Sequence, residues 1–230
     1  MAIYTINAGH GIKPNGTVGA VGILDESTEN RNVARELISY LKKEGHTVID
    51  TTVDSGDATQ IINEIVKKCN AQVVDLNISI HFNASNGTAN GVEVLGYNTN
   101  NKAIGDRINS NIASFGFANR GFKTSTTLGF LKNTNKPSLL VEVCFVDNKE
   151  DVDRYKKVGH KAIAKAIAEG ILNKKTQDTK VEETPANSSS NTIWKVQVGT
   201  YSVEASADKL VEELKLKGYN PVKIKVTTYE

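Results

Sequence analysis

The sequence predicts an α/β fold, in which a mostly parallel, twisted sheet carries helices on both faces. Over residues 1–172, short apolar runs of strand length alternate with longer segments whose apolar residues recur at helical spacing. Several of the apolar runs are nearly continuous, which is typical of strands that are covered on both faces. Strands that alternate with helices in this way favour a parallel sheet.

The first four predicted elements are two strands and two helices. Residues 2–7 form an apolar strand, and a helix over 26–43 follows and ends at Gly45. A short strand over 47–51 precedes a helix over 57–69, whose first residue is an aspartate suited to capping. The inward positions of these helices are Val33, Leu37, Ile38 and Leu41 in the first, and Ile61, Ile62, Ile65 and Val66 in the second.

The next elements complete the predicted domain. Strands are expected over 73–80 and 91–97, followed by a helix over 101–115 with isoleucines at four-residue spacing. The most apolar strand covers 139–145. A single long helix over 149–172, with alanines and isoleucines along one stripe, then ends the domain.

The composition changes after residue 172. Residues 173–192 contain one valine and no other large apolar residue, which predicts a flexible linker. A strand over 194–201, a helix over 205–217 and a strand over 221–227 then form a small βαβ module. A unit of this size buries too little surface to be secure by itself.

The bulk numbers are those of an ordinary globular protein. Apolar residues make up 39% and charged residues 23% of the 230-residue chain. The net charge of +2 gives no reason to expect a nucleic-acid partner. No segment reaches transmembrane length, and the N-terminus lacks the basic start and long apolar run of a signal peptide.

Two histidines stand at the ends of predicted strands. His10 follows the first strand in a glycine turn, and His81 ends the third. Taken alone, each histidine is more often a hydrogen-bonding or surface residue than a metal ligand. A parallel sheet brings the ends of its strands together, however, and α/β proteins build their sites there. We therefore expect His10 and His81 to lie side by side.

Candidate carboxylates come from two other places. Asp25, Glu26 and Glu29 begin the first helix, where acidic residues also serve the helix dipole, so composition leaves all three open as ligands. Glu142 interrupts the most apolar strand, where a carboxylate is costly unless it is protonated, paired or near a cation. A structural ion pair with Lys or Arg is the alternative to a role at a metal site. Two imidazoles and one carboxylate form a catalytic zinc set with one open position, and a further carboxylate suits a general base.

Four local motifs, in order, resemble the zinc-dependent N-acetylmuramoyl-L-alanine amidases of the Amidase_3 type, which occur as bacterial autolysins and phage endolysins. The resemblance covers about residues 1–172. The motifs are Asn7-Ala8-Gly9-His10-Gly11, Glu26-Ser27-Thr28-Glu29-Asn30, Ser79-Ile80-His81-Phe82-Asn83-Ala84, and Pro137-Ser138-Leu139-Leu140-Val141-Glu142 followed by Asn148-Lys149-Glu150-Asp151. Asn7 and Ala8 stand where the family usually has Asp-Pro before Gly-His. This difference alters the residues that support His10 but not the histidine itself.

The resemblance implies a site and a reaction. One Zn²⁺ would bind to His10, Glu26 and His81, with Glu26 preferred to Glu29 because Glu29 fits only in a shifted register. Glu142 would be the general base, and Asn83 would contact the substrate. The implied reaction is hydrolysis of the amide between N-acetylmuramic acid and L-alanine in bacterial peptidoglycan. Without a signal peptide, release to the cell wall is expected by lysis, a holin-type pore or another non-classical route.

Residues 193–230 resemble the start of a SPOR domain, a small module that binds glycan strands without stem peptides. The resemblance implies that Gln197 faces the glycan together with Lys195 and Tyr201; an ordinary exposed face is the alternative. Only the first half of the module is recognisable, so we expect the segment to need a second copy, by self-association, to fold and bind.

Two other functions compete with the amidase. A different zinc hydrolase of the wall, such as a peptidase or a deacetylase, would keep the metal and change the bond. The absence of a His-Glu-x-x-His helix in the sequence argues against the common zinc peptidases. A non-catalytic wall-binding protein is the second alternative, and four chemically competent side chains argue against it.

Overall fold

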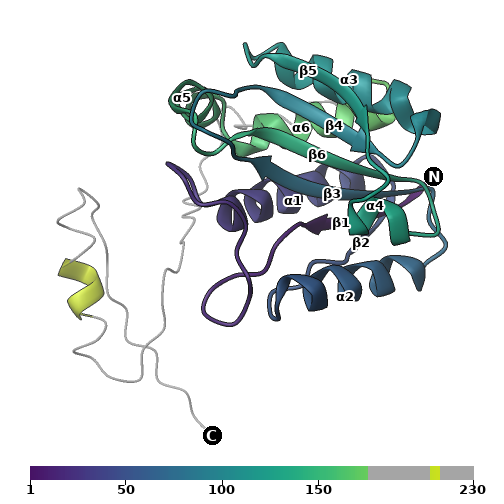
Figure 1. Cartoon of the computed structure of the whole chain (residues 1–230), viewed down its shortest axis with the longest axis horizontal. Helices are drawn as coiled ribbons and strands as arrows, with labels where there is room; N and C mark the ends of the chain where they lie inside the picture. The colour runs from purple at the N-terminus through teal and green to yellow at the C-terminus, as the bar shows by residue number, and fades with distance from the viewer. Residues whose placement is uncertain (176–207, 213–230) are drawn as a thin grey trace, which may run out of the picture. The chain divides into compact units, whose positions relative to one another are not determined.

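The structure is a computed structural model that describes residues 1–175 and 208–212 (Figure 1). The chain divides into two compact units, Met1–Asp178 and Thr179–Glu230. Residues 208–212 are helical, in agreement with the helix predicted over 205–217. The predicted linker from residue 176 onward and the remaining elements predicted for 193–230 lie outside the described residues.

A six-stranded mixed sheet forms the centre of the first unit, in the order β2-β1-β3-β6-β4-β5. Neighbouring strands are parallel except β4 and β6, which are antiparallel. The predicted class, a mostly parallel α/β sheet, is therefore confirmed. The strands are β1 (Ile3–Ala8), β2 (Thr47–Asp50), β3 (Leu76–Asn83), β4 (Val92–Gly96), β5 (Asn119–Thr124) and β6 (Ser138–Phe145).

Helices cover both faces of the sheet. Three of them, α1 (Glu26–Lys43), α3 (Lys102–Ala113) and α6 (His160–Leu172), pack together on one face, and α2 (Ala58–Asn70) with the short α4 (Gly129–Asn133) lies on the other (Figure 1). The remaining helices are α5 (Lys149–Val158) and a 3₁₀ turn, η1 (Thr99–Asn101). Among the described residues, no helix combines the length and the apolar character that crossing a membrane would require.

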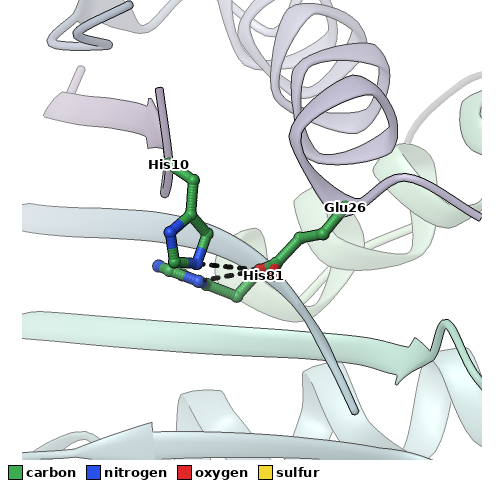
Figure 2. Close-up of side chains that lie close together, drawn as sticks. All are labelled: His10, Glu26 and His81. Carbon is green, nitrogen blue, oxygen red and sulfur yellow. Dashed lines mark hydrogen bonds and ion pairs between the residues drawn. The ribbon is translucent and has the colours of Figure 1, made fainter. Parts of the chain in front are cut away.

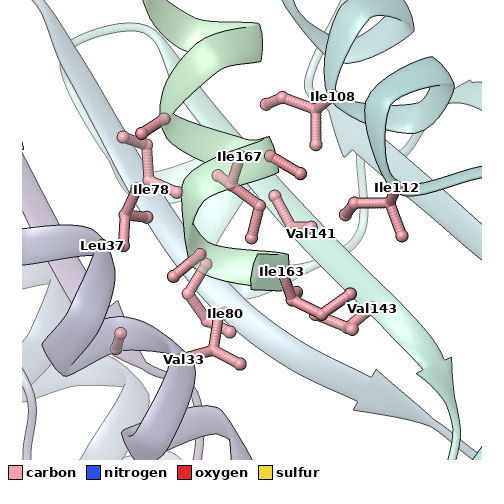
Figure 3. Close-up of a cluster of buried hydrophobic side chains, with 14 of the residues drawn as sticks. Val33, Leu37, Ile78, Ile80, Ile108, Ile112, Val141, Val143, Ile163 and Ile167 are labelled. Carbon is pink, nitrogen blue, oxygen red and sulfur yellow. The ribbon is translucent and has the colours of Figure 1, made fainter. Parts of the chain in front are cut away.

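The two faces of the sheet differ in chemistry because side chains alternate along each strand. On β3, Ile78 and Ile80 are fully buried in the larger apolar core with the helices α1, α3 and α6. Figure 3 shows this core, in which isoleucines and valines of the strands meet the inward side chains of those helices. Ser79 and His81 point to the opposite face, toward α2 and α4. The larger core therefore fixes the strands, and the other face combines polar groups with a smaller apolar cluster formed with α2 and α4.

The start of α1 is fixed by capping. The Asp25 side chain accepts a hydrogen bond from the backbone N–H of Thr28 at 2.9 Å, so the helix begins at Glu26 as predicted. Asp57 and Gln60 form a reciprocal capping box at the start of α2. Both helix starts therefore have specific side-chain partners.

Three features of the fold differ from the sequence prediction. Strand β5 and helix α4 were not predicted, because β5 is a largely exposed edge strand with a glycine inside it and α4 is only five residues long. The prediction of a single helix over 149–172 is wrong. The segment breaks into α5 and α6 at Gly159, whose backbone angles of φ 82° and ψ 150° are essentially restricted to glycine.

Substitution of Gly159 by alanine should therefore destabilise the fold. We expect Gly159→Ala to lower the free energy of unfolding by about 1–3 kcal/mol, because alanine must adopt a strained backbone conformation. Urea unfolding followed by circular dichroism measures this loss. The control is Lys161→Ala, an exposed position in α6, for which a change within about 0.5 kcal/mol is expected. Equal stability of the two variants would contradict the strain argument.

Candidate functional site

Three side chains from separate segments converge at the end of β1 (Figure 2). His10 follows β1, Glu26 is the first residue of α1, and His81 lies in β3, which pairs with β1. Oε1 of Glu26 lies 3.3 Å from Nε2 of His10 and 3.0 Å from Nδ1 of His81. One candidate ligand atom from each residue lies within 4.8 Å of the others. The structure thus brings together the three residues singled out as ligands.

The Glu26 carboxylate is buried but well supplied with donors. Its side chain accepts hydrogen bonds from the backbone N–H groups of Ala20 (2.7 Å) and Phe82 (3.0 Å). Burial alone would raise the pKa of Glu26, but hydrogen bonds and charge from His10 and His81 outweigh it and hold that pKa well below its ordinary value. The group is therefore an anion in the folded protein.

The other acidic residues at this helix start have different partners. Asp25 is the N-cap of α1. Glu29 accepts hydrogen bonds from the hydroxyl of Tyr155 at 2.8 Å and from the amide of Asn32 at 3.1 Å. Glu26 is thus the acidic residue of this turn that lies against both histidines, a distinction that composition left open.

Close backbone approach positions the histidines. A Cβ atom on Gly9 would lie 2.0 Å from the His81 ring, so the turn before His10 requires glycine. The backbone carbonyl of His10 accepts a hydrogen bond of 2.6 Å from Arg31, which also pairs with Asp54 at 2.7 Å. Arg31 was not singled out from the sequence, where an arginine inside a helix carries no distinguishing signal.

Glu142 lies next to His81 in the sheet. The two residues are register partners on the parallel strands β6 and β3, so their side chains share a face. Burial, followed by the negative charges of Glu26 and Glu93, raises the pKa of Glu142 to about 8. Its Oε2 atom is buried without a hydrogen-bond partner among the described residues. The alternative of a structural Lys or Arg partner for this carboxylate thus finds no support in residues 1–175.

A cavity of about 290 Å³ opens beside these groups. His10, His81 and Glu142 line one side, together with the polar strand residues Asn7 and Ser79. The hydroxyl of Ser79 donates to the amide oxygen of Asn7 at 2.7 Å. The opposite wall is apolar and comes from α2, α4 and the residue before α4; its side chains are Ile61, Ile62, Ile65, Leu128 and Phe130.

A second charged group continues the row of polar side chains. Glu93 on β4 is the register partner of Glu142 and is only 7% exposed. Its carboxylate pairs with Arg120 at 2.6 Å and Lys123 at 2.5 Å, both on β5, and accepts a hydrogen bond of 3.3 Å from Asn83. Asn83, the predicted substrate contact, is therefore linked to the site by its hydrogen bond to Glu93. The signal that singled out Glu142, a carboxylate within an apolar strand, was also present at Glu93.

The donor set fits a metal ion. Two imidazoles and one ionised carboxylate are ligands that suit Zn²⁺. Within residues 1–175 and 208–212, no other group of three or more His, Cys, Asp or Glu side chains is close enough to hold an ion. Lys195, Gln197 and Tyr201, predicted to contact glycan, lie outside the described residues.

Comparison with known proteins agrees with this geometry. The Amidase_3 family, described as N-acetylmuramoyl-L-alanine amidase, matches residues 5–173, and the SPOR domain matches residues 190–229. Among solved structures, the catalytic domain of the CD27L endolysin targeting Clostridia Difficile has a TM-score of 0.72 and 34% identity, and the match covers 77% of this chain and 100% of that one.

Curated relatives include proteins of bacteria and of a phage. A sporulation-specific N-acetylmuramoyl-L-alanine amidase of Bacillus subtilis is 28% identical over 94% of this chain and 82% of its own length. The endolysin of Bacillus phage SPP1 is 31% identical over 72% of this chain and 63% of its own.

An uncharacterized protein of Clostridium perfringens is 35% identical over 75% of this chain and 52% of its own length. A second uncharacterized protein of that organism is matched over 55% of its length, so the chain spans about half of these two relatives. The fold, the converging side chains and the match over residues 5–173 together show that the chain belongs to the N-acetylmuramoyl-L-alanine amidase family.

Proposed function

We propose that this chain is a zinc-dependent amidase that hydrolyses the bond between N-acetylmuramic acid and L-alanine in bacterial peptidoglycan. The observation that carries the proposal is the Glu142 carboxylate, which lies in register with His81 and whose buried Oε2 atom has no hydrogen-bond partner within residues 1–175 and 208–212. Membership of the amidase family and relatives named as amidases and endolysins support the choice of bond.

The metal-binding residues of the proposal are His10, Glu26 and His81. When bound there, Zn²⁺ would lower the pKa of a water molecule and polarise the carbonyl of the substrate. Glu26 carries the negative charge of the set, and two backbone N–H groups and the capped helix start hold it in place. Arg31 fixes the loop of His10 through the backbone carbonyl. Groups of the protein thus hold Glu26 and the loop of His10 in place independently of the metal.

Glu142 is the proposed general base. It would accept a proton from the water that attacks the amide carbon, and would then donate that proton to the leaving amine of L-alanine. Without metal, burial and the charges of Glu26 and Glu93 raise its pKa, and a Zn²⁺ ion bound nearby would act to lower that pKa again. A carboxyl group that titrates near the working pH both accepts and returns a proton readily. The cavity beside it lets substrate reach the carboxylate while the apolar wall limits contact with water.

We also propose that the C-terminal segment binds glycan. The match of residues 190–229 to the SPOR domain supports this role, with Lys195, Gln197 and Tyr201 as the proposed contacts. The protein would then act at the cell wall.

Removal of the proposed base should separate metal binding from catalysis. We expect Glu142→Gln to keep one zinc per chain and to lose activity by about 10²- to 10⁴-fold, the usual contribution of a general base. Release of new L-alanine amino termini from purified peptidoglycan measures activity, and atomic absorption measures zinc. Glu64→Gln, at a surface carboxylate on α2, serves as the matched control. Substantial activity in zinc-loaded Glu142→Gln would remove Glu142 from this role.

Removal of the metal should stop the reaction reversibly. We expect a chelator to abolish the loss of turbidity of a wall suspension, and added Zn²⁺ to restore it. His81→Ala should lose both zinc and activity, since it removes one of the proposed ligands. Product analysis should show free muramic acid residues on the glycan together with L-alanine amino termini. New amino termini on other residues would instead indicate a peptidase, and loss of acetyl groups a deacetylase.

The buried carboxyl of Glu142 should make the metal-free protein sensitive to pH. A carboxyl whose pKa is raised on folding binds its proton more tightly in the folded state, so stability falls as pH rises from about 4.5 to about 8. Glu142→Gln removes this contribution. We therefore expect urea unfolding of the chelated proteins to show Glu142→Gln gaining stability relative to wild type between pH 5 and pH 8. A constant difference across this range would show that Glu142 does not titrate there.

A further inference from the structure

We infer that Arg120 and Lys123 on β5 form a binding subsite for a carboxylate of the stem peptide. The inference rests on the proposed amidase function and adds the direction in which the substrate lies. It starts from the Glu93 cluster, defined here as Glu93, Arg120, Lys123 and Asn83, which lies beside Glu142 but is not used in the proposed chemistry.

The Glu93 cluster carries excess positive charge. One carboxylate, Glu93, is shared by the guanidinium of Arg120 and the ammonium of Lys123, so these three side chains have a net charge of +1. Glu93 is nearly buried, whereas the side chains of Arg120 and Lys123 are 33% and 42% exposed. The anion is thus enclosed and the two cations reach the surface, where an additional carboxylate can approach them.

Arg120 is held in one orientation before any ligand arrives. Its guanidinium carbon lies 5.0 Å from the centre of the Phe145 ring, and Nη1 donates a 3.4 Å hydrogen bond to the carbonyl of Asn90. Nε is already bonded to Glu93. A guanidinium fixed in this way loses little freedom on binding, and its planar set of donors matches a carboxylate.

The cations lie on the same face of the sheet as the proposed catalytic groups. His81, Glu142 and Glu93 are register partners on β3, β6 and β4, so they form a row across the strands. Lys123 pairs with Leu95, which packs against the apolar cluster of α2 and α4 on this face. The row therefore leads from the candidate metal ligands past Glu142 to the cations of β5.

The chemistry of the substrate assigns a direction to this row. In the proposed substrate the sugars are uncharged, whereas the stem peptide carries carboxylates. Strand β5 is two strands from β6, or roughly 10 Å, which is the length of about three residues of extended peptide. A carboxylate on the second or third residue would reach Arg120 and Lys123 with the cleaved amide at Glu142. The cavity between this face and the helices α2 and α4, which no residue of β5 lines, contains neither lysine nor arginine.

The experiment compares two soluble muramoyl peptides that differ only in whether their carboxyl groups are free or amidated. We expect the Arg120→Gln, Lys123→Gln double variant to lower kcat/KM for the free-carboxyl substrate by about 10- to 100-fold, mainly through KM, as lost charge-assisted hydrogen bonds predict. For the amidated substrate, kcat/KM should change less than about threefold. Lys102→Gln, on α3 at the opposite face of the sheet, is the control and should change neither value.

The ratio of kcat/KM for the free-carboxyl substrate to kcat/KM for the amidated substrate distinguishes lost binding from a structural effect of the substitutions. An altered Glu142, caused by loss of the neighbouring cations, would slow both substrates alike, so an equal loss would overturn the inference. No loss with either substrate would overturn it as well. The single variant Lys123→Gln, checked for folding by circular dichroism, should show a smaller shift of the same ratio if the double variant is unstable.

Two further outcomes have distinct meanings. A loss seen only with intact walls, and not with soluble muramoyl peptides, would assign the anion to phosphate of wall polymers and overturn the stem-peptide assignment. Failure of wild-type protein to release L-alanine amino termini from either peptide or from walls would instead overturn the proposed function on which the inference rests.

Discussion

The buried carboxylate of Glu26 is the constraint on which the site depends. An ionised carboxylate out of water is costly unless donors surround it. Here the donors come from three separate segments: the loop before α1 through Ala20, the sheet through Phe82 and His81, and the turn after β1 through His10. Satisfying this one anion therefore ties helix, loop and sheet together at the point where the candidate ligands meet.

The sheet places two carboxylates side by side and gives them opposite environments. Glu142 and Glu93 are register partners, yet burial raises the pKa of Glu142. Burial also acts to raise the pKa of Glu93, but hydrogen bonds and charge from Lys123 and Arg120 outweigh it and lower that pKa overall. Neighbouring acids whose proton affinities are separated in this way are typical of sites that move protons. Here the paired carboxylate, Glu93, belongs to a charged cluster, whereas Oε2 of Glu142 has no hydrogen-bond partner in the part of the chain that the structure describes.

Much of the fold and the site could be predicted from local patterns. The apolar strands, the capped start of α1 and the two histidines at strand ends each depend on a few neighbouring residues, and a parallel sheet then explains why His10 and His81 meet. The choice of Glu26 from its acidic neighbours could not come from composition, because it depends on which side of α1 faces β3. The predicted zinc and the catalytic role of Glu142 stay predictions.

Other features were missed because their signals are weak or distant. Strand β5 is an exposed edge with a glycine inside it, and the break at Gly159 lies within a continuous helical pattern. The same edge strand supplies Arg120 and Lys123, so missing it also hid the charged cluster. Glu93 could have been found, because it interrupts an apolar strand as Glu142 does. Its partners could not, since they lie about 30 residues away in the sequence.

The row formed by His81, Glu142 and Glu93 has a consequence for how this family can vary. Distances along the row are set by the hydrogen-bonded spacing between strands, roughly 4.8 Å, and not by any loop. Insertions in the loops that join these strands can therefore reshape the walls of the cavity without altering the spacing of these three side chains. A slip of β6 by one residue, by contrast, would turn Glu142 into the apolar core. The hydrogen bonds between strands thus fix the distances between these side chains. The loops can change in sequence and length, and with them the molecules that fit into the cavity.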